Sequence, residues 1–213
     1  MNVNVTAGTG IFIITGPSFV NNLSFSGYTG QLTPGDITVN GNLTLGTGMT
    51  IVASSSVLSF AQTGSKSITT NGVAIDLNIS FPLTASSGVW SFADALTQGS
   101  TKTFTISAGT VKLKTGVTST IGSFVANSSS VKYLQSTTPG SQATISQASG
   151  TITVSDLTIR DINATGGASW NAYADFENVD AGNNDGWNFG LSPPYASYEP
   201  PIIIRSFTQP RRF

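Results

Sequence analysis

"DITVNGNLTLG", residues 36–46, is the stretch that decides the fold of this chain. Its apolar residues alternate with Thr and Asn, which is the two-residue period of a β-strand that buries one face. Asn40 and Gly41 separate the two short runs, and an Asn-Gly pair is typical of a turn. The stretch therefore predicts two short strands around a tight corner. Its inward positions are Ile37, Val39, Leu43 and Leu45.

The same alternation continues along most of the chain, for example in VAIDLNISF (residues 73–81) and TITVSDLTIRDI (residues 151–162). Thr is β-branched and suits a half-exposed pleated surface, so these runs indicate strands and not helices. We expect a helical turn only near Phe92–Gly99. The chain is therefore predicted to be all-β. The inward positions of these runs, and of a short run at residues 89–92, are Ile75, Leu77, Ile79, Phe81, Trp90, Phe92, Ile152, Val154, Leu157 and Ile159.

Two all-β architectures fit this pattern: a β-solenoid of stacked coils and a β-sandwich of hairpins. Ser and Thr make up about a quarter of the chain, and charged residues are only 9%, against about 25% in ordinary domains. Like residues face one another between stacked coils, where charges repel and hydroxyls do not. Two-residue hairpin loops are also not evident. We therefore expect a right-handed parallel β-solenoid with an extended C-terminal tail, and keep the β-sandwich as the alternative.

The composition excludes several kinds of chemistry. The chain has no His and no Cys, which removes Ser-His-Asp and Cys-His catalysis and the commonest zinc ligands. A net charge of −1 gives no field that attracts nucleic acid or an anionic membrane. No apolar run approaches membrane-spanning length, and the N-terminus lacks the features of a signal peptide. We expect a protein that is not an enzyme, has no cofactor and binds neither nucleic acid nor membrane.

Residues 164–190 form a dense segment after the solenoid body expected at residues 1–163. Its carboxylates offer a weak candidate calcium site, although their spacing matches no known loop motif and turn capping explains them as well. Its aromatic residues are expected to cover the open end of the core, where no further coil buries apolar surface. The metal candidates are Asp175, Glu177, Asp180 and Asp185, and the structural cap residues are Trp170, Trp187 and Phe189.

A pair of carboxylates, Asp156 and Asp161, lies near the end of the body with Arg160 between them. Two carboxylates at a suitable separation hydrolyse polysaccharides. Alternation places Asp156 and Arg160 outward from their strand. The simpler interpretation is therefore a surface ion pair between these two side chains, and no catalytic residue is assigned.

Residues 191–213 differ from the rest of the chain. They hold five of the nine prolines and three of the four arginines, together with an apolar PIIIRSF run. We expect an extended arm that lies on a partner or folds back on its own solenoid. The partner-binding candidates are Tyr195, Tyr198, Ile202, Ile203, Ile204, Arg205, Phe207, Arg211, Arg212 and Phe213.

The segment NNLSFSGYTGQLTPGDITVNGNLTLGTGMT (residues 21–50), continued by VLSFAQTGSKSITTNGVAIDLNISF (residues 57–81), resembles virion structural proteins of tailed bacteriophages of cyanobacteria and marine bacteria. GGASWNAY and VDAGNNDGWNF, in the later dense segment, resemble a closing segment that follows β-helical regions in phage and bacterial surface proteins. The resemblance implies a right-handed parallel β-helix, a homo-oligomer (a trimer) and a place on the virion.

The chain lacks a long attachment region, a coiled coil and a collagen-like stretch, which favours a compact role over a tail fibre. The expected function is a capsid decoration or cement protein that binds the major capsid protein or other virion proteins. A receptor-binding spike or short fibre for host glycans is the alternative, and a polysaccharide depolymerase is the third.

Overall fold

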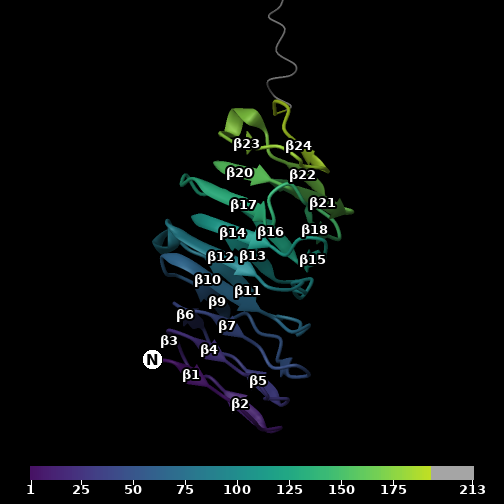
Figure 1. The fold of residues 1–213 in the computed structure, drawn as a ribbon. Coiled ribbons are helices and arrows are strands. Elements are labelled where there is room, and N and C mark those ends of the chain that lie inside the picture. The colour runs from purple at the N-terminus through teal and green to yellow at the C-terminus, as the bar shows by residue number, and fades with distance from the viewer. Residues whose placement is uncertain (193–213) are drawn as a thin grey trace, which may run out of the picture.

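A computed structural model of the protein describes residues 1–192, and these residues form a β-solenoid (Figure 1). Every strand pair among them is parallel, and one sheet of nine strands runs the length of the stack, one strand for each coil. The solenoid prediction is therefore confirmed, and the β-sandwich is wrong because hairpins require antiparallel pairs. The nine strands are β1 (Val3–Asn4), β4 (Leu23–Ser24), β7 (Leu43–Thr44), β10 (Gly64–Thr69), β12 (Gly88–Phe92), β14 (Gly109–Leu113), β17 (Lys132–Ser136), β20 (Leu157–Arg160) and β23 (Val179–Asp180).

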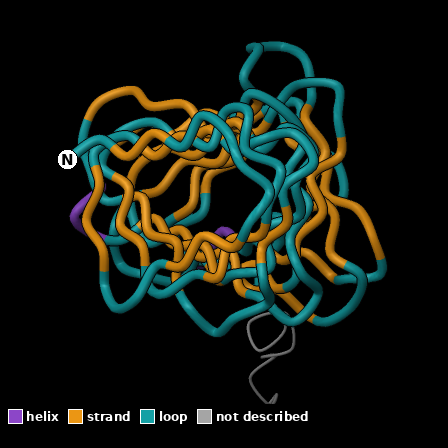
Figure 2. The backbone as a smooth tube through the Cα atoms, turned by 90° about the horizontal axis from the view of Figure 1, so that it is seen from below, coloured by secondary structure: helices purple, strands orange, loops and turns teal. Residues whose placement is uncertain are grey.

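Four smaller sheets complete the wall of the solenoid. Seen along the stack, the coils superimpose around one interior, which side chains fill (Figure 2). The second sheet contains β3 (Ser18–Val20), β6 (Ile37–Val39), β9 (Val57–Phe60), β11 (Asn78–Phe81), β13 (Thr103–Ile106) and β16 (Ser123–Val125). The three-stranded sheets are β2 (Ile11–Ile13), β5 (Gln31–Thr33) and β8 (Thr50–Ile51); β15 (Thr118–Ile121), β18 (Ala143–Gln147) and β21 (Ile162–Gly166); and β19 (Thr151–Thr153), β22 (Ser169–Asn171) and β24 (Trp187–Asn188).

The core consists of the inward positions that alternation predicts. All the inward residues named from the three quoted stretches, and Trp90 with Phe92, are buried. The register of the strands places similar residues above one another in successive coils: Leu23 pairs with Leu43, and Leu43 pairs with Ile68. Aromatic rings continue this stacking along the second sheet, with centroids 5.2 Å apart for Phe60 and Phe81. Each coil thus buries apolar surface only by covering its neighbour.

Gly41 lies at the corner between the two short strands of residues 36–46. Gly41 donates its N–H to the carbonyl of Asn21 in the coil below. A Cβ on Gly41 would overlap that carbonyl and the side-chain oxygen of Asn22. The corner therefore requires glycine because two backbones approach closely there.

The helical turn expected at Phe92–Gly99 is wrong. Phe92 ends β12, and Thr97 and Gln98 form parallel bridges to neighbouring coils. The Asp94 carboxylate accepts the backbone N–H groups of Thr70 and Asn71, which ties this corner to the coil below. The helical elements within residues 1–192 are two short 3₁₀ turns, η1 (Leu83–Ala85) and η2 (Ala174–Phe176).

The boundary expected after residue 163 falls inside β21. Residues 164–190 continue the stack as its last turns, because β22 pairs with β19 and β24 pairs with β22. The arm expected at residues 191–213 lies outside the described residues, apart from Leu191 and Ser192.

Candidate functional site

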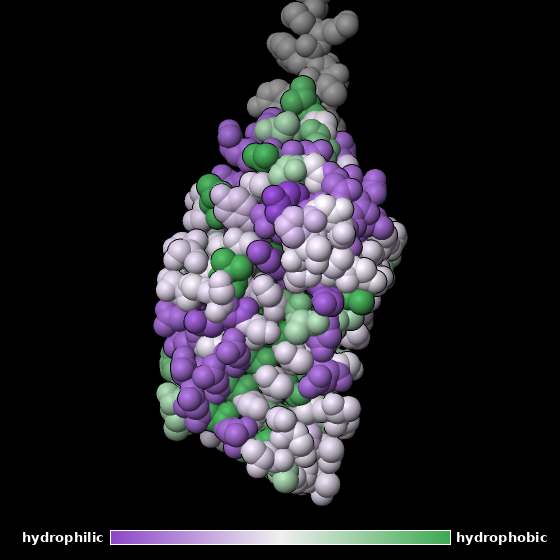
Figure 3. Space-filling model, viewed as in Figure 1, coloured by the Kyte–Doolittle hydropathy of each residue, from purple (hydrophilic) through white to green (hydrophobic). Residues whose placement is uncertain are grey.

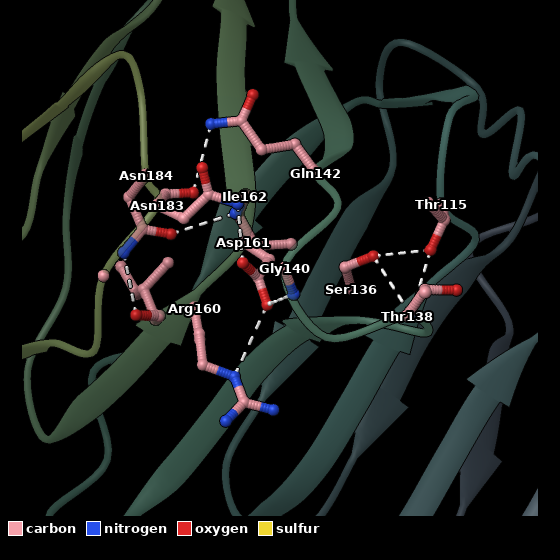
Figure 4. A network of polar contacts seen from close by, with 12 residues as sticks. Thr115, Ser136, Thr138, Gly140, Gln142, Arg160, Asp161, Ile162, Asn183 and Asn184 are labelled. Carbon is pink, nitrogen blue, oxygen red and sulfur yellow. Dashed lines mark hydrogen bonds and ion pairs between the residues drawn. The ribbon is translucent and has the colours of Figure 1, made fainter.

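Asp161 lies in a network of polar contacts at the corner that follows β20 (Figure 4). It is 3% exposed and has a φ of 58°. The carboxylate accepts the N–H of Gly140 at 3.0 Å and the side-chain amide of Asn183 at 2.7 Å. Arg160 approaches the same carboxylate, with Nε 3.5 Å from Oδ2. Two hydrogen bonds and one ion pair therefore hold this buried carboxylate.

The ion pair expected between Asp156 and Arg160 is wrong, because Arg160 pairs with Asp161. Asp156 lies in the corner before β20 and has a φ of 51°. Its backbone bonds to neighbouring coils: its N–H donates to Phe176, and its carbonyl accepts from Lys132. Asp161 is buried and its carboxylate bonds to residues from other coils, so this corner fastens coils together.

Asn184 extends the network toward the last coil. Its amide donates to the Ile159 carbonyl at 2.8 Å and to Asp180 at 2.6 Å, and its oxygen accepts the N–H of Ile162 at 2.9 Å. Gln142 reaches across to Asp185 at 2.8 Å. A separate hydroxyl cluster lies beside it in Figure 4, with Thr115 and Ser136 oxygens 2.7 Å apart.

The four metal candidates do not converge. Asp175 binds Ser192, Asp180 caps Gly182, and Asp185 accepts from Gln142. Glu177 ends η2 with a φ of 57°. In residues 1–192 no group of three or more carboxylates is placed to hold a metal ion. Asp180 acts instead as a turn cap, and Asp175 and Asp185 accept hydrogen bonds from residues distant in sequence.

Asp175 has a perturbed acidity. It accepts the Ser192 hydroxyl at 2.6 Å and the Ser192 N–H at 3.0 Å. The hydrogen bond from the Ser192 hydroxyl is the main cause that lowers the pKa of Asp175 below its ordinary value of 3.8. Ser192 is 4% exposed, so this bond fixes the point at which the described chain ends.

Lys132 is a buried cation that alternation did not single out. It begins β17 and points inward, and its ammonium donates to the carbonyls of Ser128 at 2.7 Å and Ser130 at 2.8 Å. Burial lowers the pKa of Lys132, and the charge of Asp156 acts in the opposite direction. The sequence pattern does indicate this burial, because Lys132 lies two residues before the buried Leu134 and therefore on the same face of the strand. Its role is to satisfy carbonyls of the 128–130 loop.

Aromatic rings cover the core at the C-terminal end. Trp170 is 3% exposed and lies 5.0 Å from Trp187, centroid to centroid. Both rings lie near the ring of Phe124, which belongs to an earlier coil, with centroid distances of 5.9 Å and 6.3 Å. Phe189 is partly buried against the same core. The three expected cap residues therefore lie together at this end.

The N-terminal end has no such cover in the described residues. An open hollow of about 350 Å³ lies there, lined by residues of the first two coils, among them Val3, Phe12 and Phe19. Three large apolar side chains that line it are more than half exposed, namely Met1, Ile13 and Phe19. This hollow is a largely apolar concavity within residues 1–192.

The outer wall is mostly small and polar. One face shows polar and weakly polar residues with separate apolar spots (Figure 3). On the nine-stranded sheet, Tyr133 lies between Thr110 and Thr158 in register, and Gln135 lies between Lys112 and Arg160. Tyr133 is 38% exposed, so this outward row offers one aromatic face amid hydrogen-bonding groups.

The ten partner-binding candidates, from Tyr195 to Phe213, lie outside the described residues. No helix within residues 1–192 has the length and apolar character needed to cross a membrane. Comparison of the chain with protein-family models, with curated proteins and with solved structures gave no significant match.

Proposed function

We propose that this chain is a non-enzymatic structural protein of a phage virion, a capsid decoration or cement protein on the outer surface of the particle. The resemblance of residues 21–81 to virion proteins supports this role, as does a charged fraction of only 9%. The proposed partners are the major capsid protein or other virion proteins, with several copies of the chain in a symmetric oligomer.

The observation that carries the proposal is how the polar side chains are used. Buried polar groups bond to neighbouring coils or to the loops beside them. Gln98 bonds to Leu77 and Thr103, Asn178 to Val154 and Tyr173, and Asp161 to Gly140. These hydrogen bonds occupy the polar side chains that a catalytic site would need, and they make the stack of coils more rigid. A rigid, hydroxyl-covered body is what a particle surface requires.

Electron microscopy of purified phage particles tests this proposal. An antibody against the solenoid, with a gold label, should decorate the capsid at regular positions, and mass spectrometry of the same particles should detect the chain in many copies. Particles that lack the chain would overturn the virion role. Label confined to the tail would overturn the capsid role and favour the glycan-binding spike.

A second candidate, a receptor-binding spike, is favoured by the outward row around Tyr133. An exposed aromatic ring flanked by Lys112, Gln135 and Arg160 suits a sugar, which offers a C–H face and hydroxyls. A glycan array probed with the protein and with Tyr133→Ala tests it, with Leu83→Ala, another exposed position, as the matched control. Loss of a specific signal in Tyr133→Ala alone would support the spike.

The depolymerase stays a prediction, tested by a turnover assay on host capsule and lipopolysaccharide. Asp161 is buried, so its carboxylate is not open to a polysaccharide there.

A further inference from the structure

The outer face of the nine-stranded sheet carries exposed apolar side chains over β17, β20 and β23, which lie one above another in Figure 1. Tyr133 pairs with Thr158, and Thr158 pairs with Val179, so these three outward residues form a central row along the stack. Tyr133 is 38% exposed and Val179 is 50% exposed. Val131, two positions before Tyr133, is 59% exposed. The central row therefore lies in a partly apolar strip.

Carboxylates lie along one side of the central row, at the start of the strands. Asp156 directly precedes β20, and its N–H donates to the carbonyl of Phe176, which brings Glu177 beside it in the next coil. Asp156 lies two positions before Thr158, and Glu177 lies two positions before Val179. Both acidic positions are therefore about 6.6 Å from the central row, measured along the strands.

Basic residues lie along the other side of the central row, toward the end of the strands. Arg160 lies two positions after Thr158, and the register places Gln135 and Lys112 in the same row. Figure 4 shows that Arg160 contacts Asp161 through Nε, with the two terminal nitrogens directed away from Asp161. Those two nitrogens can donate hydrogen bonds to a second carboxylate.

The charges on this face are only partly matched within one copy. Neither of the two ion pairs within residues 1–192 involves Asp156, Glu177 or Lys112. The acidic and basic sides stay about 13 Å apart along the strands, because the central row separates them. Opposite charges brought to them from outside would fix the orientation of a partner.

Two further charged residues border the same face. Lys114 lies two positions beyond Lys112 and adds to the basic side. Asp180, in β23, accepts hydrogen bonds from Gly182 and Asn184 and is therefore held by its own coil. The face thus keeps one acidic side and one basic side around an apolar strip.

A second copy of the same face matches this pattern when a two-fold axis follows the central row. Rotation about that axis exchanges the two sides, so Asp156 of each copy faces Arg160 of the other, and Tyr133 faces Tyr133. An axis across the strands would instead place carboxylates against carboxylates. Sheets pack face to face at about 10 Å, a gap that side chains from both copies fill. Such a self-complementary patch is the mark of an isologous contact.

We infer that two copies of this chain pack through the outer face of the long sheet, with their coils running in the same direction and the two-fold axis along Tyr133, Thr158 and Val179. The inference goes beyond the proposed function, because the contact is a property of the purified chain and holds even if phage particles lack it. The resemblance implies a trimer, whereas this contact makes a dimer, so the size of the oligomer separates the two.

Crosslinking on the axis of the full-length protein tests the contact, and the chain has no native cysteine. Thr158→Cys places a thiol where it faces the same thiol of the second copy. A bismaleimide with a spacer of about 10 Å, the distance between packed sheets, should link the protein as a dimer. Leu83→Cys, which is 59% exposed on η1, is the control and should give little dimer. Equal crosslinking of the two variants would overturn the inference.

A charge exchange tests the orientation of the two copies. Asp156→Lys and Arg160→Glu each place like charges opposite one another, and each should weaken dimerisation roughly tenfold or more in sedimentation equilibrium. In a mixed dimer of the two variants both pairs are again of opposite sign, so an equimolar mixture should regain the dimer. A mixture that does not associate more tightly than either variant would overturn the two-fold orientation.

The fold of each charge variant is checked by circular dichroism in dilute solution, because Asp156 has a φ of 51° and Arg160 pairs with Asp161. Tyr133→Asp measures the same contact at an exposed position that makes no ion pair. It places two carboxylates face to face on the axis and should abolish the dimer. Leu83→Asp is the matched control and should dimerise as the parent does. Unchanged dimerisation of Tyr133→Asp would overturn the inference.

The oligomer of the parent protein decides against the other occupants of this face. Parent protein that sediments as a monomer at every concentration tested, or as a trimer, would overturn the inference. A glycan-array signal that monomeric protein gives and Tyr133→Ala loses would show a sugar on this face in place of a second copy. A dimer that the Thr158→Cys crosslink does not trap would show that a different surface joins the copies.

Discussion

The two ends of the solenoid bury the same kind of core in different ways. At the C-terminal end, Trp170 and Trp187 lie over Phe124, and Asp161 and Asn184 tie the last corners together. At the N-terminal end, Phe12 contacts Phe25 but also lines an open hollow. Both ends belong to one continuous ladder of parallel strands. The difference teaches that a solenoid needs a cover at each end, and that in the described residues this chain supplies its own at one end only.

The largest effect should come from breaking the covered end. Trp170→Ala removes a ring that is 3% exposed and contacts two other aromatic rings. We expect a loss of about 3–5 kcal/mol in the free energy of unfolding, the usual range for a buried aromatic residue. Urea denaturation followed by circular dichroism measures it. Leu191→Ala, at a position 60% exposed, is the control and should change little. A loss in Trp170→Ala as small as that in Leu191→Ala would mean that Trp170 does not cover the core.

Loss of a hydrogen bond to Asp161, at the same end of the solenoid, should have the next largest effect. Asp161→Asn keeps a residue that tolerates a positive φ but leaves one of its donors, Gly140 or Asn183, without an acceptor. A buried group left unpaired costs about 1–3 kcal/mol. Thermal denaturation at pH 7 checks this value. Asp185→Asn, an exposed carboxylate that accepts from Gln142, should stay within about 0.5 kcal/mol.

At the open end the matching truncation should cost less. Phe12→Ala removes a ring that is only partly buried, so we expect a loss of about 1 kcal/mol in dilute protein. Urea denaturation followed by circular dichroism measures this value. A loss as large as that of Trp170→Ala in dilute protein would erase the contrast between the ends.

The smallest effect concerns pH at the point where the described chain ends. The folded pKa of Asp175 lies below its ordinary value, so its hydrogen bonds to Ser192 stabilise the fold above that value and are lost as pH falls through the lowered pKa. The Ser192 amide proton should shift in NMR spectra with a midpoint below 3.8, the ordinary value for Asp. In Asp175→Asn this transition should vanish. A midpoint above the ordinary value would contradict the sign.

Alternation predicted the inward face well, because Ile37, Val39, Leu43 and Leu45 follow a rule that depends only on neighbours in sequence. Contacts between coils depend instead on which residues the next coil brings alongside, and the coils differ in length. Leu23 pairs with Leu43, but Leu43 pairs with Ile68.

For the same reason the predicted partner of Arg160 is wrong, and so is the helical turn predicted at the corner that contains Asp94. Asp161 and Lys132 gain their roles from corners that only the stack brings together. A sequence read alone does not fix those registers.

Hydrogen exchange of the full-length protein, followed by mass spectrometry, tests the central claim most directly. The account predicts that amides of β1, β2 and β3 exchange much faster than those of β12, β14 and β17, which have a coil on both sides. Peptides around β22 and β24, which carry the paired tryptophan rings, should be better protected than β1–β3. Exchange at β1–β3 as slow as at β12, β14 and β17 would contradict the claim that the two ends differ in their cover.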